Sequence, residues 1–143
     1  MKQIKMGSWT VEVDVEKTIA FYETYYLITE DCNCDYCVNY VRACDSFPRE
    51  VMELFSMFGI DPRKEGEVFE LSETEDGLHI YNGFYHFVGR IIESPDDDQL
   101  ENFRPDTSIE ISFDEQIDLL PESFPSPVVQ LIFQLNIPWL LDS

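Results

Sequence analysis

Three cysteines lie close together in one polar stretch and offer the most specific chemistry in the sequence. Cys32, Cys34 and Cys37 fall within the segment 31–37, which reads DCNCDYC. The Cys-x-x-Cys spacing of the last two allows both sulfur atoms to bind one tetrahedral ion. A turn that leads into a helix also lowers thiol pKa values, and thiolate is both the metal ligand and the nucleophile. The cluster therefore indicates either metal binding or thiol redox chemistry.

The fourth cysteine, Cys44, is predicted to be a core residue. If residues 37–44 are helical, Cys37 and Cys44 lie about 10 Å apart, which exceeds the ~7 Å limit for a disulfide. That separation is also too long for the two thiols to share one ion easily. A fourth metal ligand must then come from another part of the chain, from water, or from Asp31 or Asp35.

Both histidines of the chain flank an Asn-Gly pair, the strongest short-range signal for a two-residue hairpin turn. Counting outward from Asn82-Gly83 places His79 opposite His86, on one face, with Cβ atoms about 5 Å apart. We prefer His86 as a ligand because it lies in the longer predicted strand, before an apolar run. The alternative is that both imidazoles form an ordinary polar or aromatic-packed pair on the hairpin.

Sulfur and imidazole ligands together favour zinc in a tetrahedral site. We therefore expect a structural zinc ion at Cys32, Cys34 and Cys37, completed by His86 or His79. If no metal binds, the thiols are free and a redox role becomes the better interpretation. Against that role, no strand leads into the Cys-x-x-Cys helix within a βαβ unit, as a thioredoxin-like site requires.

The elements that would position these residues follow from hydrophobic periodicity. Alternation over residues 9–15 predicts a strand, and Asp14 can cap a helix that runs to about Ile28. A second helix is expected over Tyr36–Cys44. A third begins near Pro48 and ends at Gly59, because proline suits a first turn and glycine a C-terminus.

The pattern changes to strands from Glu67 onwards. The expected strands are Val68–Leu71, Leu78–Tyr81, Phe84–Ile92, Ile109–Phe113 and Val129–Ile137. Helices that cluster early and strands that cluster late predict an α+β fold. We expect an N-terminal strand and about three helices packed on a mainly antiparallel sheet formed largely by the C-terminal half. At 143 residues, the chain is expected to form a single domain, 1–143.

The net charge of the chain indicates which classes of partner it can bind. The chain has 29 acidic and 9 basic side chains, a formal net charge of −20. Such a surface repels phosphate backbones and anionic membranes, so direct nucleic-acid or membrane binding is not expected. It can complement a basic protein partner, although solubility alone also explains it. The start of the chain lacks the apolar core of a secretory signal, and residues 128–141 are too short and polar to span a membrane, which predicts a cytoplasmic protein.

Three segments carry a resemblance to other proteins. Cys32–Tyr40, Gly59–Pro62 and Gly83–Arg90 together resemble a group of small uncharacterised bacterial proteins with a Cys-x-Cys-x-x-Cys element. The resemblance covers roughly the middle half of the chain and implies a bacterial source, with no activity to transfer.

Two classes of function remain. The favoured one is a non-enzymatic acidic binding or regulatory protein, such as an inhibitor or immunity protein, whose zinc ion locks the helical part to the hairpin. The alternative is a thiol-redox or zinc-dependent enzyme that uses Cys32, Cys34 and Cys37. No catalytic residue is assigned, since the sequence lacks a phosphate loop, a nucleophile elbow and a His-Glu-x-x-His motif.

Overall fold

The computed structural model describes residues 1–143 except 33, 96–100, 103–108, 116–119 and 142–143. Within this part, the helices are α1 (Val15–Thr24), α2 (Ile28–Asp31), α3 (Asp35–Cys44) and α4 (Arg49–Phe58). The strands are β1 (Lys2–Met6), β2 (Trp9–Val13), β3 (Glu67–Glu73), β4 (Leu78–Glu93), β5 (Glu101–Asn102), β6 (Glu110–Asp114) and β7 (Val128–Pro138). Every strand pair is antiparallel, and most strands lie in the C-terminal half, which confirms the predicted α+β fold class. None of the helices found in these ranges is long and apolar enough to cross a membrane.

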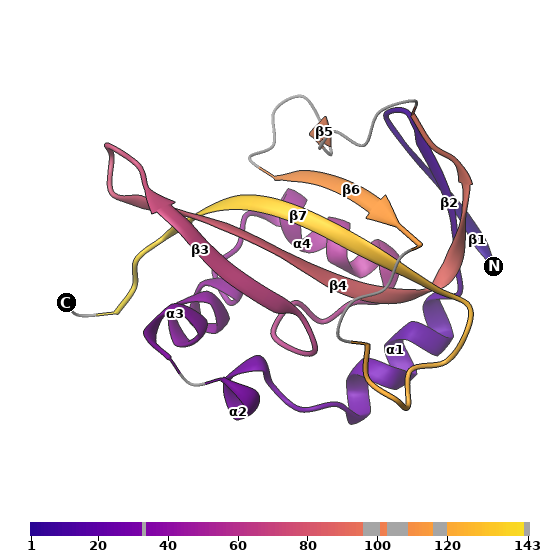
Figure 1. Cartoon of the computed structure of the whole chain (residues 1–143), viewed down its shortest axis with the longest axis horizontal. Helices are drawn as coiled ribbons and strands as arrows, with labels where there is room; N and C mark the ends of the chain where they lie inside the picture. Colours follow the sequence, from indigo (N-terminus) through magenta and orange to yellow (C-terminus); the bar gives the residue numbers. More distant parts are fainter. Residues whose placement is uncertain (33, 96–100, 103–108, 116–119, 142–143) are drawn as a thin grey trace.

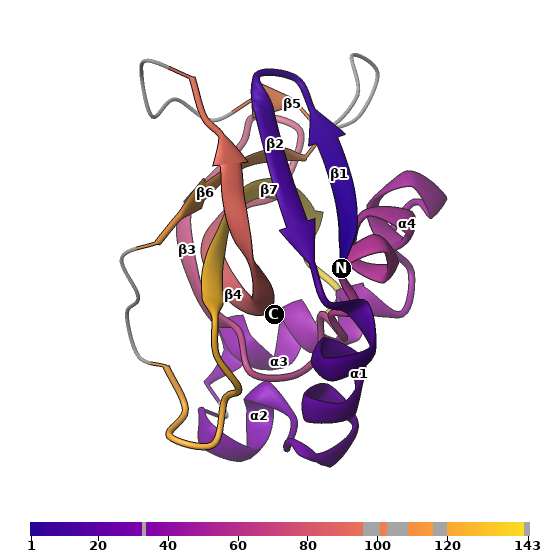
Figure 2. The same cartoon turned by 90° about the vertical axis from the view of Figure 1, so that its right-hand side faces the viewer.

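Strand β4 is the centre of the sheet (Figure 1). One edge of β4 pairs with β7, from Leu78 to Val88. The opposite edge is divided between two partners, since β3 pairs with residues 79–84 and β2 pairs with residues 89–93. Figure 2 shows the sheet curving strongly over α1 and α2, with α4 to one side. The divided edge leaves a short gap at residues 85–88, and this gap contains a buried polar network described below.

The continuity of β4 contradicts the predicted hairpin turn. Asn82 and Gly83 lie inside the strand, paired with β7 on one side and with β3 on the other. The turn between β3 and β4 is instead at Thr74–Gly77, where Gly77 has a φ of +84° and the Thr74 hydroxyl accepts a hydrogen bond from Leu78 N–H at 3.0 Å. The Asn-Gly prediction was wrong because pairing on both edges outweighs a local turn preference.

Gly83 has a different role from the one predicted. A Cβ atom at this position would lie 2.3 Å from the carbonyl oxygen of Glu67 and 2.9 Å from the ring of Phe133. Both distances are shorter than a side chain tolerates. The glycine therefore allows two neighbouring strands and an aromatic ring to approach β4 closely.

The first helix is capped as predicted but ends early. Asp14 Oδ1 accepts a hydrogen bond from Lys17 N–H at 3.1 Å, which satisfies a free donor of the first turn. After Thr24 the chain becomes extended, and Leu27 forms an isolated antiparallel bridge with Lys64. The helix does not reach Ile28 because the backbone is extended at Tyr25 and Leu27, and the Ile28 N–H donates to the carbonyl oxygen of Arg63 at 2.9 Å. That extended link brings α2 and the cysteines next to the start of β3.

The main core lies between the sheet and helices α3 and α4. The rings of Tyr85 and Phe55 have centroids 5.1 Å apart, and those of Phe87 and Phe58 are 4.8 Å apart. Helix α4 ends at Gly59, with a φ of +79°, as the sequence indicated. Cys44 is buried in this core, which agrees with its predicted packing role.

Candidate metal centre

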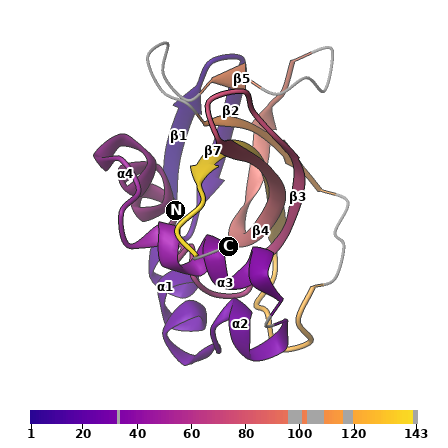
Figure 3. The same ribbon diagram turned by 90° about the vertical axis from the view of Figure 1, so that its left-hand side faces the viewer.

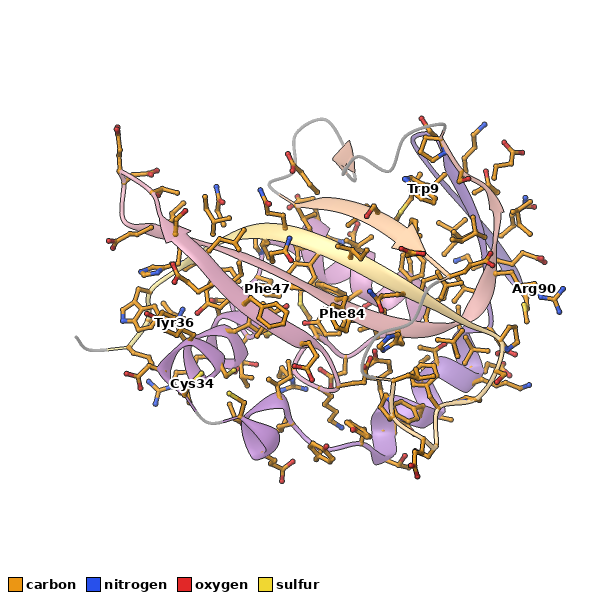
Figure 4. All side chains as sticks on the ribbon, viewed as in Figure 1. Trp9, Cys34, Tyr36, Phe47, Phe84 and Arg90 are labelled. Carbon is orange, nitrogen blue, oxygen red and sulfur yellow. The ribbon has the colours of Figure 1, made fainter. Side chains whose placement is uncertain are left out.

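The three clustered cysteines lie where α2 ends and α3 begins, and we call this part of the structure, residues 32–37, the cysteine corner. Cys32 is the C-cap of α2, Cys34 is the N-cap of α3, and Cys37 is in the first turn of α3. Their sulfur atoms all lie within 4.8 Å of one another. The sulfur atoms of Cys32 and Cys34 are 3.4 Å apart, and both side chains are exposed, whereas Cys37 is buried. Figure 4 shows Cys34 and Tyr36 at this corner, below β3.

This spacing fits one tetrahedral metal ion. A zinc–sulfur bond of about 2.3 Å places two tetrahedral ligands about 3.8 Å apart. One sulfur–sulfur separation is 3.4 Å and the others are at most 4.8 Å, so small rotations of the side chains can bring all three sulfur atoms to one ion. Three thiolates also form a soft donor set, which favours zinc or a similar thiophilic ion over magnesium or calcium.

The surroundings of the cysteines also shift the pKa values of two of the thiols in opposite directions. The backbone N–H of Cys37 contributes most to a lowered pKa of the Cys34 thiol, and the thiols of Cys32 and Cys37 lower it further. Burial raises the pKa of Cys37, and the two neighbouring thiols raise it again. An exposed thiol at a helix N-terminus therefore loses its proton first, while the buried one keeps its proton. A metal ion would compensate the charge of all three thiolates.

Hydrogen bonds from the sheet fix the position of α3. The Tyr81 hydroxyl donates to the carbonyl oxygen of Tyr36 at 2.7 Å, one residue before Cys37. Asn39 donates to the carbonyl oxygen of Pro138 at 3.1 Å and accepts from Leu140 N–H at 2.6 Å. Strand β4 therefore holds the first turn of α3, next to two of the three thiols, and the end of β7 with the residues after it holds the second turn.

Neither histidine joins the thiols. His79 and His86 lie seven positions apart on the same strand, so their side chains point to opposite faces of the sheet. Among the described residues, the group of close potential ligands contains only Cys32, Cys34 and Cys37. The pairing of the two imidazoles across a hairpin was wrong because no turn separates them. Asp35 is not part of the group either, and the side chain of Asp31 lies outside the described part of the chain.

Each histidine has partners of its own. The His79 ring lies 3.5 Å from Glu70 and 3.6 Å from Glu73, and it packs against Trp139 with centroids 4.7 Å apart. His86 is completely buried, with Nδ1 2.8 Å from Glu65 Oε2 and Nε2 3.2 Å from Gln130 Oε1. These contacts occupy both nitrogen atoms of His86.

Glu65 is the central residue of the network in the gap between β2 and β3. Its Oε1 accepts the backbone N–H of His86 at 2.9 Å and the hydroxyl of Tyr22 at 2.6 Å. Glu65 also has a φ of +68°, which is uncommon for a residue with a side chain. Nothing in the sequence separates Glu65 from 28 other acidic residues. The carboxylate is buried against an imidazole because of the register of β4, which places His86 in the gap between β2 and β3.

A pocket of about 370 Å³ opens beside the cysteines. Its lining includes the three thiols and Tyr36, and also the continuous run of residues 65–70, which leads into β3. We call this cavity the edge pocket. The exposed thiols of Cys32 and Cys34 can therefore be reached by a second molecule from the edge pocket.

The histidine network and the cysteine corner are thus two separate features of the molecule. Comparison with protein-family models, with curated proteins and with solved structures gave no match to this chain, and the resemblance to small bacterial proteins stays a prediction.

Proposed function

We propose that this protein binds one zinc ion through the thiolates of Cys32, Cys34 and Cys37, as a structural centre of a non-enzymatic, acidic binding or regulatory protein. The observation that carries the proposal is the convergence of three sulfur atoms within 4.8 Å. Without a metal ion, three neutral thiols at this distance stabilise one another only weakly. If they share one ion, each forms a strong metal–sulfur bond.

A structural role follows from what the cluster connects. Helix α2 has only four residues, too few to be stable without external contacts. An ion shared by Cys32, Cys34 and Cys37 would tie this helix to α3 and close the corner. Because a preformed site does not exist in the unfolded chain, the free energy of metal binding becomes free energy of folding. Three thiolates leave the fourth position to water or to a side chain outside the described residues.

The metal content of the purified protein tests this proposal. We expect native mass spectrometry of protein prepared without chelator to show one zinc ion per chain. Cys34→Ser should weaken zinc binding by at least about tenfold, in the range seen when metal-site partners are removed. The matched control is Cys44→Ser, which removes a buried thiol outside the cluster and should keep the zinc ion. Wild-type protein without metal, or full occupancy in folded Cys34→Ser protein, would refute the zinc site.

One observation favours a second candidate, a thiol-redox function. Cys34 is exposed at the start of a helix, and Cys37 follows it by one turn, at a spacing that a disulfide can close. The two thiols would form one disulfide, and the two electrons and two protons released would reduce a disulfide in the substrate to two thiols. Metal-free wild-type protein whose Cys34 and Cys37 oxidise reversibly with a glutathione redox buffer would support this candidate over zinc binding.

A further inference from the structure

The edge pocket lies against the free edge of a strand. Side chains of consecutive strand residues point to opposite faces, so a cavity lined by all four of the β3 residues 67–70 touches the edge of β3 rather than one face. In the described part of the chain, β3 pairs with β4 only. Figures 1 and 3 show β3 at the border of the sheet, with α2 and α3 below it.

Aromatic side chains gather at the same place. Tyr26, Tyr36 and Phe69 line the edge pocket and are 44%, 48% and 50% exposed, respectively. They are all the aromatic side chains that the described residues leave exposed. Rings exposed at random would be scattered over the surface, whereas contiguous ones mark interaction sites. Faces of aromatic rings also attract cations.

The charge of the pocket has one sign. Glu67 and Glu70 line the edge pocket beside Glu65, whose carboxylate is turned into the buried network with His86, and the described lining contains no lysine, arginine or histidine. Together with the net charge of −20, this favours a cationic occupant. It also disfavours a second copy of the chain on this edge, because glutamates of two β3 strands would face each other. Like charges directly opposite in a sheet are destabilising.

We infer that the edge pocket binds an extended, arginine- or lysine-bearing segment of a partner protein, which adds as a strand to the free edge of β3. The backbone of the segment would hydrogen-bond to β3, and its cationic side chains would contact the glutamates and the exposed rings. The inference rests on the binding role proposed above but not on the zinc ion.

A synthetic peptide that alternates arginine and threonine, labelled with a fluorophore, is the probe. We expect fluorescence anisotropy to detect binding to the wild-type protein, with an affinity that falls as salt is added. A glutamine–threonine peptide tests the need for charge. The arginine–threonine peptide with alternate backbone nitrogens methylated tests the need for strand pairing. Each change should weaken binding by about tenfold or more, a loss of roughly 1.4 kcal/mol.

Variants of the chain test the location. Glu67→Gln combined with Glu70→Gln should weaken peptide binding about tenfold, and Phe69→Ala about threefold. Glu93→Gln, which removes an exposed charge at the far end of β4, is the matched control and should leave the affinity within about twofold. Amide NMR shifts on titration should be largest over residues 65–70.

Three outcomes would overturn the inference: equal binding of the methylated peptide, an equal loss of affinity in Glu93→Gln, or amide shifts concentrated away from β3. The zinc content of the same samples is measured separately. Peptide binding without zinc would refute only the metal centre, and zinc without peptide binding would refute only the edge pocket as a docking site.

Discussion

Glu65 supplies a hydrogen-bond acceptor at the point where the edge of β4 has no strand partner. The N–H of His86 would otherwise be buried without an acceptor, which costs about 1–3 kcal/mol. The same carboxylate binds the imidazole of His86 and the hydroxyl of Tyr22. A residue with positive φ is kept here because its side chain satisfies three donors at once.

The two histidines should therefore behave differently on substitution. We expect His86→Ala to lower the free energy of unfolding by about 3–5 kcal/mol, because it opens a cavity and leaves a buried carboxylate with fewer donors. His79→Ala removes a partly exposed ring beside two glutamates and should cost about 1 kcal/mol or less. Urea denaturation followed by circular dichroism measures both. Loss of bound zinc from a folded His86→Ala protein would contradict this assignment and restore the imidazole as a ligand.

Three of the four thiols should react in a set order once metal is removed. In chelator-treated protein at neutral pH, we expect iodoacetamide to modify Cys34 before Cys37 and Cys44. The pKa of Cys34 is lowered and its side chain is exposed, whereas burial raises the pKa of both Cys37 and Cys44. Peptide mapping after brief alkylation gives the order, and unfolding in urea should abolish it. Early modification of Cys44 in native protein would contradict the described packing.

At the residue scale, only the local part of the candidate site could be predicted. The three cysteines are close in sequence, so their spacing alone brings the sulfur atoms together. The position of His86 depends on how far β4 extends, and that depends on partners more than forty residues away, such as Gln130. Sequence periodicity shows which residues share a face of a strand, but not which residue of a distant strand lies beside His86.

Strand β4 shows how pairing overrides a local signal at the scale of an element. The Asn-Gly pair has the composition of a turn, but Asn82 faces Phe69 in β3 and Gln134 in β7. Strand pairing on both sides satisfies the backbone groups that a turn would leave to water. The helices were easier to predict, because their caps and apolar stripes are local. Strand β1 and helix α2 were missed, because β1 has only two buried residues, Ile4 and Met6, and a helix of four residues is too short to show a period.

Two substitutions distinguish a strand from a turn at this place. Asn82→Thr should change the free energy of unfolding by no more than about 0.5 kcal/mol, because threonine suits a strand. Gly83→Ala should cost about 2 kcal/mol or more, because the new Cβ would meet Glu67 and Phe133. Urea denaturation of both variants gives the comparison. A large loss for Asn82→Thr would indicate positive φ at that residue, as in a two-residue turn.

At the scale of the whole molecule, buried tyrosines make the fold sensitive to alkali. Burial raises the pKa of Tyr81 to about 12, and it raises the pKa values of Tyr22, Tyr40 and Tyr85 well above their usual range. The Tyr85 hydroxyl, for example, donates to the carbonyl oxygen of Pro62 at 2.6 Å and needs its proton to do so. The folded state therefore holds these protons more tightly than the unfolded state.

The sign of the pH effect follows from that difference. The contribution of these groups to stability is complete below the unfolded tyrosine pKa of about 10 and is lost as pH rises through the higher folded values. We expect tyrosinate absorbance of the buried rings to appear together with the loss of circular dichroism as pH rises above about 10. Tyr85→Phe separates one ring from the others. Complete ionisation of the tyrosines in a protein that keeps its native spectrum would contradict their burial.

The divided edge of β4 also bears on how the molecule opens. Among the described residues, the β1–β2 hairpin pairs with the rest of the sheet only through the last residues of β4, whereas β3 and β7 pair with the first part of the same strand. The β1–β2 hairpin can therefore open transiently without disturbing β3 or β7. The two parts of β4 can then belong to separate units that protect their amides from hydrogen exchange independently. The amide of His86 lies at their border and is bonded to a carboxylate rather than to a strand. Its deuterium exchange rate should report the release of Glu65, independently of either unit.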